Sequence, residues 1–116
     1  MHEWGLAESI AEATRTRAGE RPVARIRVRI GALLRADEES LQQAFTMMNT
    51  GTDLDGIKLE LVFVPGNGVC HDCGAEVKVR DPWTVCPGCQ GGHVHAPDGE
   101  DMILELIEYR PALEVR

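Results

Sequence analysis

Four cysteines in two close pairs constrain this chain more than any other feature. They lie in CHDC and CPGC, at Cys70, Cys73, Cys86 and Cys89. Two intervening residues let both thiolates of a pair reach one ion, and two such pairs supply four sulfur ligands. A tetrahedral shell of four thiolates is typical of structural Zn(II), and its closure leaves no position for catalysis. We therefore predict a structural zinc site, with Gly74 and Gly88 in its tight turns.

The segment that carries these cysteines, residues 65–101, is rich in Gly, Pro, Cys, His and Asp and shows little apolar periodicity. It is too poor in apolar side chains to fold around a core of its own. We expect a zinc-binding module over residues 66–100 that is inserted into a larger domain and is disordered without metal. A thioredoxin-like redox function is the weaker interpretation, because neither pair follows a strand and opens a helix.

Three histidines lie near the cysteine pairs in sequence: His71, His93 and His95. In so polar a segment, solvated loop residues are the favoured interpretation. The alternative is that one histidine replaces a thiolate or binds a second metal ion. Such a site would be sensitive to pH, because imidazole changes charge near neutrality.

The N-terminal part of the chain predicts a helix followed by a strand. Apolar residues at Leu6, Ile10 and Ala13 have helical spacing and indicate a helix over residues 4–18. The stretch VARIRVRIG, residues 23–31, alternates strictly between apolar residues and arginine. This alternation is typical of a half-buried strand.

A second helix and two more strands follow. Either Asp37 or Ser40 can cap the second helix, and Gly51 occupies the position of a C-terminal glycine. Alternation predicts strands at residues 57–64 and 102–109.

The order helix, strand, helix, strand, insertion, strand predicts an α+β fold. A helical crossover makes the first two strands parallel, and the third returns after the insertion. We expect a small mixed three-stranded sheet with two helices, plus an inserted four-cysteine module resembling a zinc ribbon. The expected domains are an α/β core of residues 1–65 and 101–116 and a zinc-binding module of residues 66–100.

Charge and length exclude several classes of protein. The chain has 116 residues and a net charge of −7, which opposes general binding to nucleic acids or anionic membranes. No stretch approaches the roughly 18 apolar residues of a membrane span, and the N-terminus lacks the pattern of a signal peptide. We expect a cytoplasmic protein whose thiols do not form disulfides.

The N-terminal residues Met1, His2 and Glu3 form a candidate nickel site. The Met1 amine, the deprotonated His2 amide nitrogen and His2 Nδ1 can close two adjacent chelate rings in one plane. Three planar nitrogens suit Ni(II) or Cu(II) better than Zn(II). The fourth position stays open for Glu3, another carboxylate or a partner's ligand. The alternative is a histidine that occurs here by chance and has no metal function.

An acidic run, Asp37, Glu38 and Glu39, offers further carboxylates. The favoured interpretation is an acidic first turn of a helix, which the helix dipole stabilises. With the cysteines assigned to zinc, no Ser/His/Asp or Cys/His arrangement and no phosphate-binding glycine loop is evident. We therefore do not expect an enzyme.

Several of these motifs occur together in one known family. MHEWGLAESI, VRIGALLRADEESLQQAF, the Gly-Thr at 51–52, VPGNGVCHDCG and CPGC together resemble the HypA/HybF family, from Met1 to Glu108. Its members are nickel metallochaperones of [NiFe]-hydrogenase maturation. The resemblance implies nickel binding at His2 with Glu3 beside it, and structural zinc on the four cysteines.

The resemblance also implies partners. These are the hydrogenase large-subunit precursor, which receives the nickel, and the GTPase HypB; some relatives also serve urease. It implies no membrane or nucleic-acid partner, and we expect a monomer or a weak homodimer. The alternative function is a zinc-ribbon adaptor that binds protein or nucleic acid and has no nickel role. Its best support is the stripe of Arg25, Arg27 and Arg29, which we interpret as a solvated strand face.

Overall fold

The computed structural model describes residues 3–111, and these form two compact units. The first unit contains residues 3–28, 36–62 and 103–111 of the described chain, and the second contains residues 29–35 and 63–102. Within the described chain, no helix is both long enough and apolar enough to cross a bilayer.

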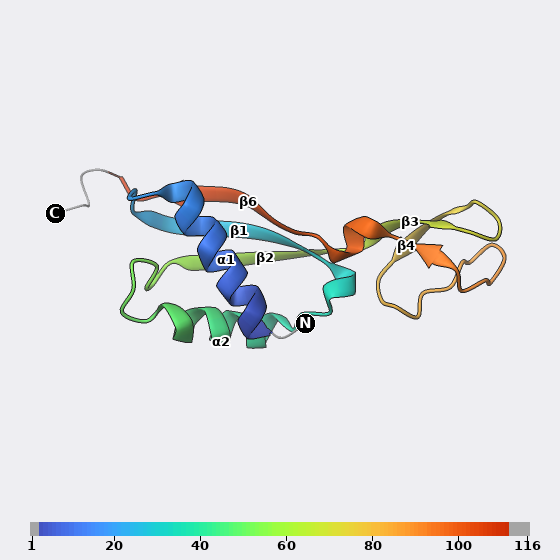
Figure 1. The fold of residues 1–116 in the computed structure, drawn as a ribbon, viewed down its shortest axis with the longest axis horizontal. Coiled ribbons are helices and arrows are strands. Elements are labelled where there is room, and N and C mark those ends of the chain that lie inside the picture. The colour runs from blue at the N-terminus through green and yellow to red at the C-terminus, as the bar shows by residue number, and fades with distance from the viewer. Residues whose placement is uncertain (1–2, 112–116) are drawn as a thin grey trace. The chain divides into compact units, whose positions relative to one another are not determined.

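The first unit is built on a three-stranded sheet in the order β2-β1-β6. Its strands are β1 (Val23–Gly31), β2 (Lys58–Val64) and β6 (Met102–Tyr109). In Figure 1, β1 and β2 run in the same direction and β6 runs back against them. The predicted mixed sheet, with a parallel pair across a helical crossover, is therefore confirmed.

Helix α1 (Glu3–Ala18) buries a face of small and aliphatic residues. Leu6 and Ile10 are almost fully buried, as predicted, but Ala13 is exposed and Thr14 is buried in its place. The Thr14 hydroxyl satisfies its hydrogen-bonding capacity within the helix by donating to the Ile10 carbonyl oxygen at 2.7 Å. A polar residue can therefore occupy the buried face without an unpaired group.

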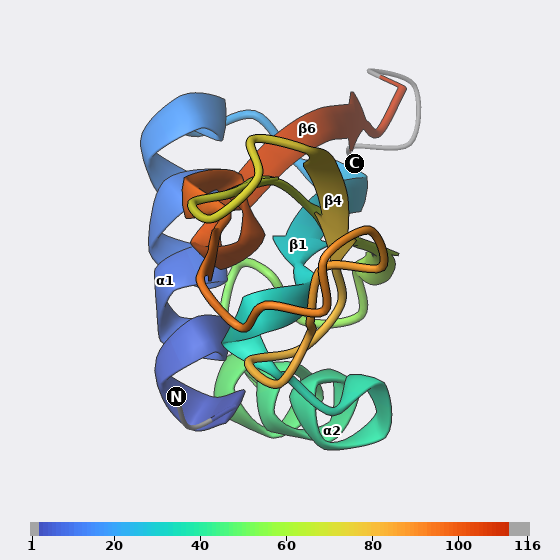
Figure 2. The ribbon, with the colours of Figure 1, turned by 90° about the vertical axis from the view of Figure 1, so that its right-hand side faces the viewer.

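Helix α2 (Glu38–Asn49) begins after Asp37, whose side chain accepts a hydrogen bond from the Ser40 amide at 2.9 Å. Of the two candidate caps, Asp37 is therefore the one used. After the helix, Gly51 has φ of +80°, the left-handed conformation that a glycine adopts most easily. In Figure 2, the N-terminal part of α1 lies beside α2.

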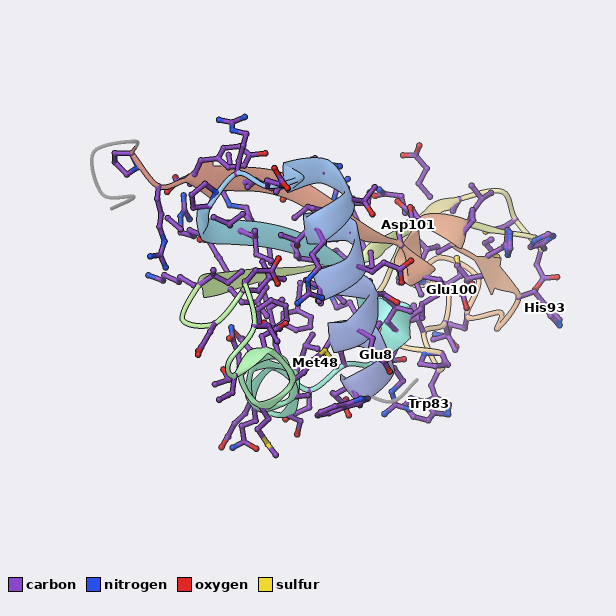
Figure 3. The ribbon with its side chains drawn as sticks, turned by 60° about the vertical axis from the view of Figure 1, so that its left-hand side comes forward. Glu8, Met48, Trp83, His93, Glu100 and Asp101 are labelled. Atoms are coloured by element: carbon purple, nitrogen blue, oxygen red, sulfur yellow. The ribbon has the colours of Figure 1, made fainter. Side chains whose placement is uncertain are left out.

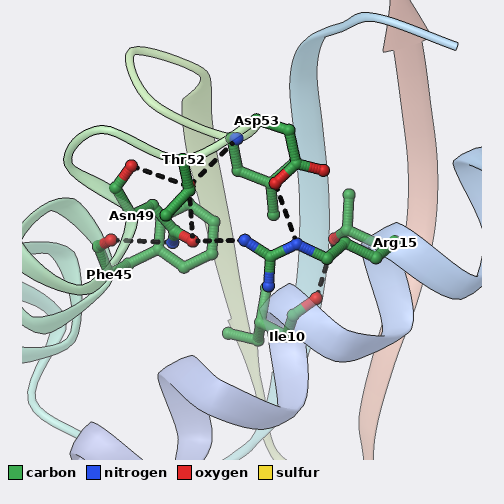
Figure 4. Close-up of polar contacts among 8 residues, drawn as sticks. Ile10, Arg15, Phe45, Asn49, Thr52 and Asp53 are labelled. Carbon is green, nitrogen blue, oxygen red and sulfur yellow. Dashed lines mark hydrogen bonds and ion pairs between the residues drawn. The ribbon is translucent and has the colours of Figure 1, made fainter. Parts of the chain in front are cut away.

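A buried polar network joins the two helices, which the apolar pattern did not indicate (Figure 4). Asn49, 2% exposed, donates to the Phe45 carbonyl oxygen at 2.8 Å and accepts from the Arg15 guanidinium at 3.2 Å. The same guanidinium contacts the Asp53 carboxylate at 3.0 Å. Asn49 thus fixes Arg15 of α1 to the end of α2.

The second unit contains its own small sheet, in the order β4-β3-β5. Its strands are β3 (Gly66–Cys70), β4 (Glu76–Val79) and β5 (Val94–His95), and both pairings are antiparallel. Two short 3-10 helices, η1 (Ala32–Leu34) and η2 (Pro97–Glu100), complete the unit. The sequence did not predict these strands, because they are short and alternate over too few residues.

Residues 29–35 pack with the second unit through a close backbone approach. A Cβ on Gly31 would lie 2.2 Å from the carbonyl oxygen of Gly99, so only glycine fits at this position. The Gly31 amide donates to the Asp101 carbonyl oxygen at 2.8 Å. The Leu33 side chain packs against the buried cluster of the unit. Nothing in the sequence pattern indicated that this segment supplies apolar area to the cysteine module.

The Asn49 network predicts a specific loss of stability. We expect Asn49→Ala to lower the free energy of unfolding by about 1–3 kcal/mol, because it removes a buried side chain with its hydrogen bonds and takes one of the two acceptors from the Arg15 guanidinium. Asp53→Ala is the matched control. It removes only the exposed side of the same network, so we expect a change of about 0–1 kcal/mol. Urea unfolding of both variants checks this, and equal losses would contradict it.

Candidate metal centres

The four cysteines converge on one point in the second unit. Their Sγ atoms all lie within 4.8 Å of one another, with Cys70 to Cys89 and Cys73 to Cys86 each at 3.6 Å. Around an ion with metal–sulfur bonds of about 2.3 Å, tetrahedral sulfurs are about 3.8 Å apart. The observed spacing therefore matches a cage for one tetrahedral metal ion. Among the described residues, this is the only group of three or more His, Cys, Asp or Glu with its ligand atoms gathered in this way.

Each cysteine pair is shaped by the same two backbone hydrogen bonds. In the first, the Cys70 carbonyl oxygen accepts from the Gly74 amide at 2.8 Å, and the Cys70 amide donates to Ala75 at 2.9 Å. In the second, the Cys86 carbonyl oxygen accepts from the Gln90 amide at 2.7 Å, and the Cys86 amide donates to the Gly91 carbonyl oxygen at 2.9 Å. These bonds fold each pair back on itself, so that its two sulfurs face the same point.

The left-handed position of each turn is the residue directly after the second cysteine. Gly74 occupies it in the first turn with φ of +77°, as predicted, but Gln90 occupies it in the second with φ of +63°. Gly88 does not take a positive φ, so its predicted role is wrong. An alignment of CHDCG with CPGCQ pairs Gly74 with Gln90. It would have predicted the left-handed conformation at Gln90 rather than at Gly88.

The surroundings of Cys86 and Cys89 shift the pKa values of their thiols in opposite directions. Backbone amides of Cys89 and Gly88 donate toward Cys86 and lower the pKa of its thiol to about 7. Cys89 accepts from the Gly91 amide, which favours its thiolate. The neighbouring thiols of Cys70 and Cys73 outweigh this bond and raise the pKa of Cys89 to about 12. A divalent cation would offset the repulsion between four clustered thiolates.

The cage rests on a small apolar cluster. Cys70 and Cys86 are buried with Val77, Val79 and Ala96, while Cys73 and Cys89 face solvent. Five buried residues are a small core for a unit of this size, so the metal cage must supply much of its stability. This apolar cluster was not predicted, because the segment has few apolar side chains and little periodicity.

The three histidines lie outside the cage. The rings of His71 and His95 are 6.2 Å apart between centroids, and His93 Nδ1 lies 3.1 Å from the Asp72 carboxylate. All three are exposed, in agreement with the favoured interpretation as solvated residues.

At the N-terminus, Met1 and His2 lie outside the described residues, and Glu3 is the first described member of the predicted nickel site. The Glu3 carboxylate accepts a hydrogen bond from the Asp37 amide at 3.1 Å, which lowers the pKa of Glu3. The beginning of α1 is thereby tied to the cap of α2. The Asp37 carboxylate itself caps α2, and Glu38 and Glu39 lie in its first turn. This agrees with the interpretation of the acidic run as the beginning of a helix.

The arginine stripe on β1 is matched by carboxylates from both neighbouring strands. Arg25 contacts Glu60 of β2 at 2.7 Å and also Glu108 of β6, and Arg27 contacts Glu60 at 2.8 Å. Hydrogen bonds from Arg27 and Arg25 lower the pKa of Glu60. Nucleic-acid affinity depends on cations that are available to phosphates. These ion pairs therefore weaken the adaptor interpretation.

A comparison with protein families identifies the chain. The model of the family described as "Hydrogenase/urease nickel incorporation, metallochaperone, hypA" matches residues 1–109. The chain belongs to the HypA family. A hydrogenase maturation factor HypA from Cereibacter sphaeroides is 32% identical over 111 residues, covering 93% of this chain and 98% of the relative. One from a Nostoc species is 33% identical over 108 residues, covering 93% and 95%.

The fold is also that of a solved HypA structure. The solution structure of the Ni metallochaperone HypA from Helicobacter pylori matches with a TM-score of 0.64 at 23% identity, covering 94% of this chain and 97% of that one. A second solution structure of a HypA protein matches with a TM-score of 0.59 at 22% identity. At these identities the likeness shows the fold.

Removing one ligand from the cage should unfold the cysteine module selectively. We expect Cys86→Ser to abolish retention of the metal and to expose residues 66–97 to protease, because the remaining apolar cluster is small. Val85→Ser is the matched control, since Val85 is the adjacent residue and is 52% exposed. Metal analysis and limited proteolysis check this. A Cys86→Ser protein that resists protease without metal would contradict it.

The left-handed turn at Gly74 predicts a smaller effect. We expect Gly74→Ala to destabilise the module by about 1 kcal/mol, because alanine is strained at positive φ although no atom lies within 4 Å of its Cβ position. Gly92→Ala is the matched control, because Gly92 has the same free space without a positive φ. Competition with a metal chelator checks the pair. Equal metal retention in both variants would contradict the expected backbone strain of alanine at position 74.

Proposed function

We propose that this protein carries Ni(II) for the maturation of [NiFe]-hydrogenase and is not itself an enzyme. The observation that supports this most strongly is the family match, which includes the N-terminal residues as well as the cysteine module. Within that match, His2 lies directly before the first described residue of α1.

The proposed nickel site uses nitrogen donors at the N-terminus. The Met1 amine, the His2 amide nitrogen and His2 Nδ1 form a planar set that favours Ni(II) over Zn(II). Glu3 is the candidate fourth donor from this chain. Its contact with the Asp37 amide engages Oε2, and it anchors the peptide next to His2 to the rest of the unit.

The proposed metal of the cysteine cage is Zn(II), with a structural role. Four thiolates at tetrahedral spacing are a preferred Zn(II) shell, and a closed shell holds its ion rather than releasing it. The two metal sites thus have opposite requirements. The cage must retain its ion, and the N-terminal site must be able to give its nickel up.

The proposed recipient of the nickel is the hydrogenase large-subunit precursor in the cytoplasm, with HypB supplying nucleotide hydrolysis. The family description names both hydrogenase and urease, and the curated relatives reported above are hydrogenase maturation factors. We therefore propose hydrogenase as the client.

A nickel titration tests the N-terminal site. The protein is prepared with its own Met1 amine and with the cage loaded with zinc, and it is compared with a version that carries one extra glycine before Met1. We expect the visible absorption band of one equivalent of planar nickel in the first protein only. The extension removes the chelating amine, so this band should disappear, as it should in His2→Ala.

A matched pair of variants tests the fourth donor. Glu3→Gln keeps an oxygen that can accept from the Asp37 amide but lowers the affinity of that oxygen for nickel, so the nickel band should shift. Glu8→Gln removes an exposed carboxylate from the same helix and should leave the band unchanged. An equal planar-nickel band in the native and glycine-extended proteins would contradict the proposed site.

A further inference from the structure

The three exposed histidines of the second unit lie on one face of the β3–β5 pair. The register pairs Val69 with His95 and Cys70 with Val94. The His71 amide donates to the His93 carbonyl oxygen at 2.8 Å, so the pairing continues by one position. Opposite residues in an antiparallel pair share a face, and successive residues alternate. His71, His93 and His95 therefore share the face that Cys70 does not.

Two of these imidazoles are already close enough to share a metal ion. Two rings bound to one ion through nitrogen at about 2.0–2.1 Å have centroids roughly 4.5–6.4 Å apart, depending on the angle at the metal. The centroids of His71 and His95 are 6.2 Å apart, within that range. This value lies near the upper end of the range, where the two ligands are almost opposite each other, so a smaller angle at the metal would need both exposed side chains to rotate.

The third histidine is oriented by a carboxylate, as metal-binding histidines often are. His93 Nδ1 lies 3.1 Å from Asp72 Oδ2, and the imidazole side chain is 77% exposed. Figure 3 shows His93 projecting away from the strands into solvent. A hydrogen bond from Nδ1 to a carboxylate fixes the tautomer and leaves Nε2 as the donor atom.

We propose that His71 and His95, with His93 beside them, form a second, exposed binding site for a late first-row divalent cation such as Ni(II). Imidazole nitrogen prefers such cations to Mg²⁺ or Ca²⁺, which select oxygen ligands. The site is separate from the thiolate cage, because Cys70 points to the opposite face and is buried. It contains none of the residues of the proposed N-terminal site. The chain therefore has an open imidazole site that exchanges metal with solvent, in addition to the N-terminal site.

The experiment isolates this site from the N-terminal one. The full-length protein with zinc in the cage and one extra glycine before Met1 is titrated with Ni(II) in slightly alkaline buffer, because metal ions bind the unprotonated form of imidazole. Calorimetry measures affinity, and proton NMR records the histidine ring signals. Nickel bound by imidazoles and water is paramagnetic, whereas planar nickel is not. We expect one saturable equivalent that broadens the ring signals of His71 and His95 first.

Three variants and one control assign the ligands. We expect His71→Gln and His95→Gln each to weaken Ni(II) binding by at least about tenfold, and Asp72→Asn, a positioning residue, by about tenfold. Glu76→Gln is the matched control. Glu76 of β4 pairs with Val69 of β3 and is exposed on the same face as the histidines. This variant therefore tests whether a nearby carboxylate alone contributes to Ni(II) binding. The Ni(II) affinity of Glu76→Gln should stay within twofold of that of the glycine-extended protein.

Several results would overturn the proposal. One is the absence of saturable Ni(II) binding to the extended protein, and another is an unchanged Ni(II) affinity in His71→Gln and His95→Gln. A third is release of zinc in proportion to the nickel added, which would place nickel on the thiolates. Retained zinc in each variant shows that the module is still folded. Loss of this site would not affect the one-equivalent planar band of the unextended protein, so the two nickel proposals fail separately.

Discussion

The convergence of four sulfur atoms is the constraint on which the second unit depends. That unit has only a small cluster of buried residues, and two of them are ligand cysteines. Its strands are short, and its two turns each contain a residue in the left-handed conformation. A metal ion bound to all four thiolates would join both turns to the β4-β3-β5 sheet. It would supply stability that hydrophobic burial alone does not give so small a unit.

In the first unit, side-chain hydrogen bonds hold α1 in place from its first residue, Glu3. The α1 helix is fixed at one end by the contact of Glu3 with Asp37 and further along by the Arg15–Asn49 hydrogen bond (Figure 4). Between these points, Glu8 of α1 and Met48 of α2 line a shallow groove that Trp4 also borders (Figure 3). Glu3, the residue that follows the proposed ligand His2 in the sequence, thus belongs to an ordered element.

Much of the first unit could be predicted, because its periodicities are long. Both helices and the sheet of β1, β2 and β6 were predicted within one or two residues of their observed ends, since each runs for at least seven residues. The second unit could be predicted only through its cysteines. Strands as short as β5, and a left-handed glutamine at Gln90, have no sequence pattern of their own. Asn49 and Thr14 were missed because a polar residue looks like a surface residue until its hydrogen-bond partners are known.

The sequence by itself determined the ligand types, their spacing and the order of the main elements. These are local properties, set by thiol chemistry and by hydrophobic alternation along one segment. Tertiary structure decided which residues meet across long separations: Glu60 and Glu108 with Arg25, Leu33 with the cysteine module, and Glu3 with Asp37. Each of these contacts depends on where two distant segments lie in space. That placement follows from the summed packing of the fold, which no single stretch of residues encodes.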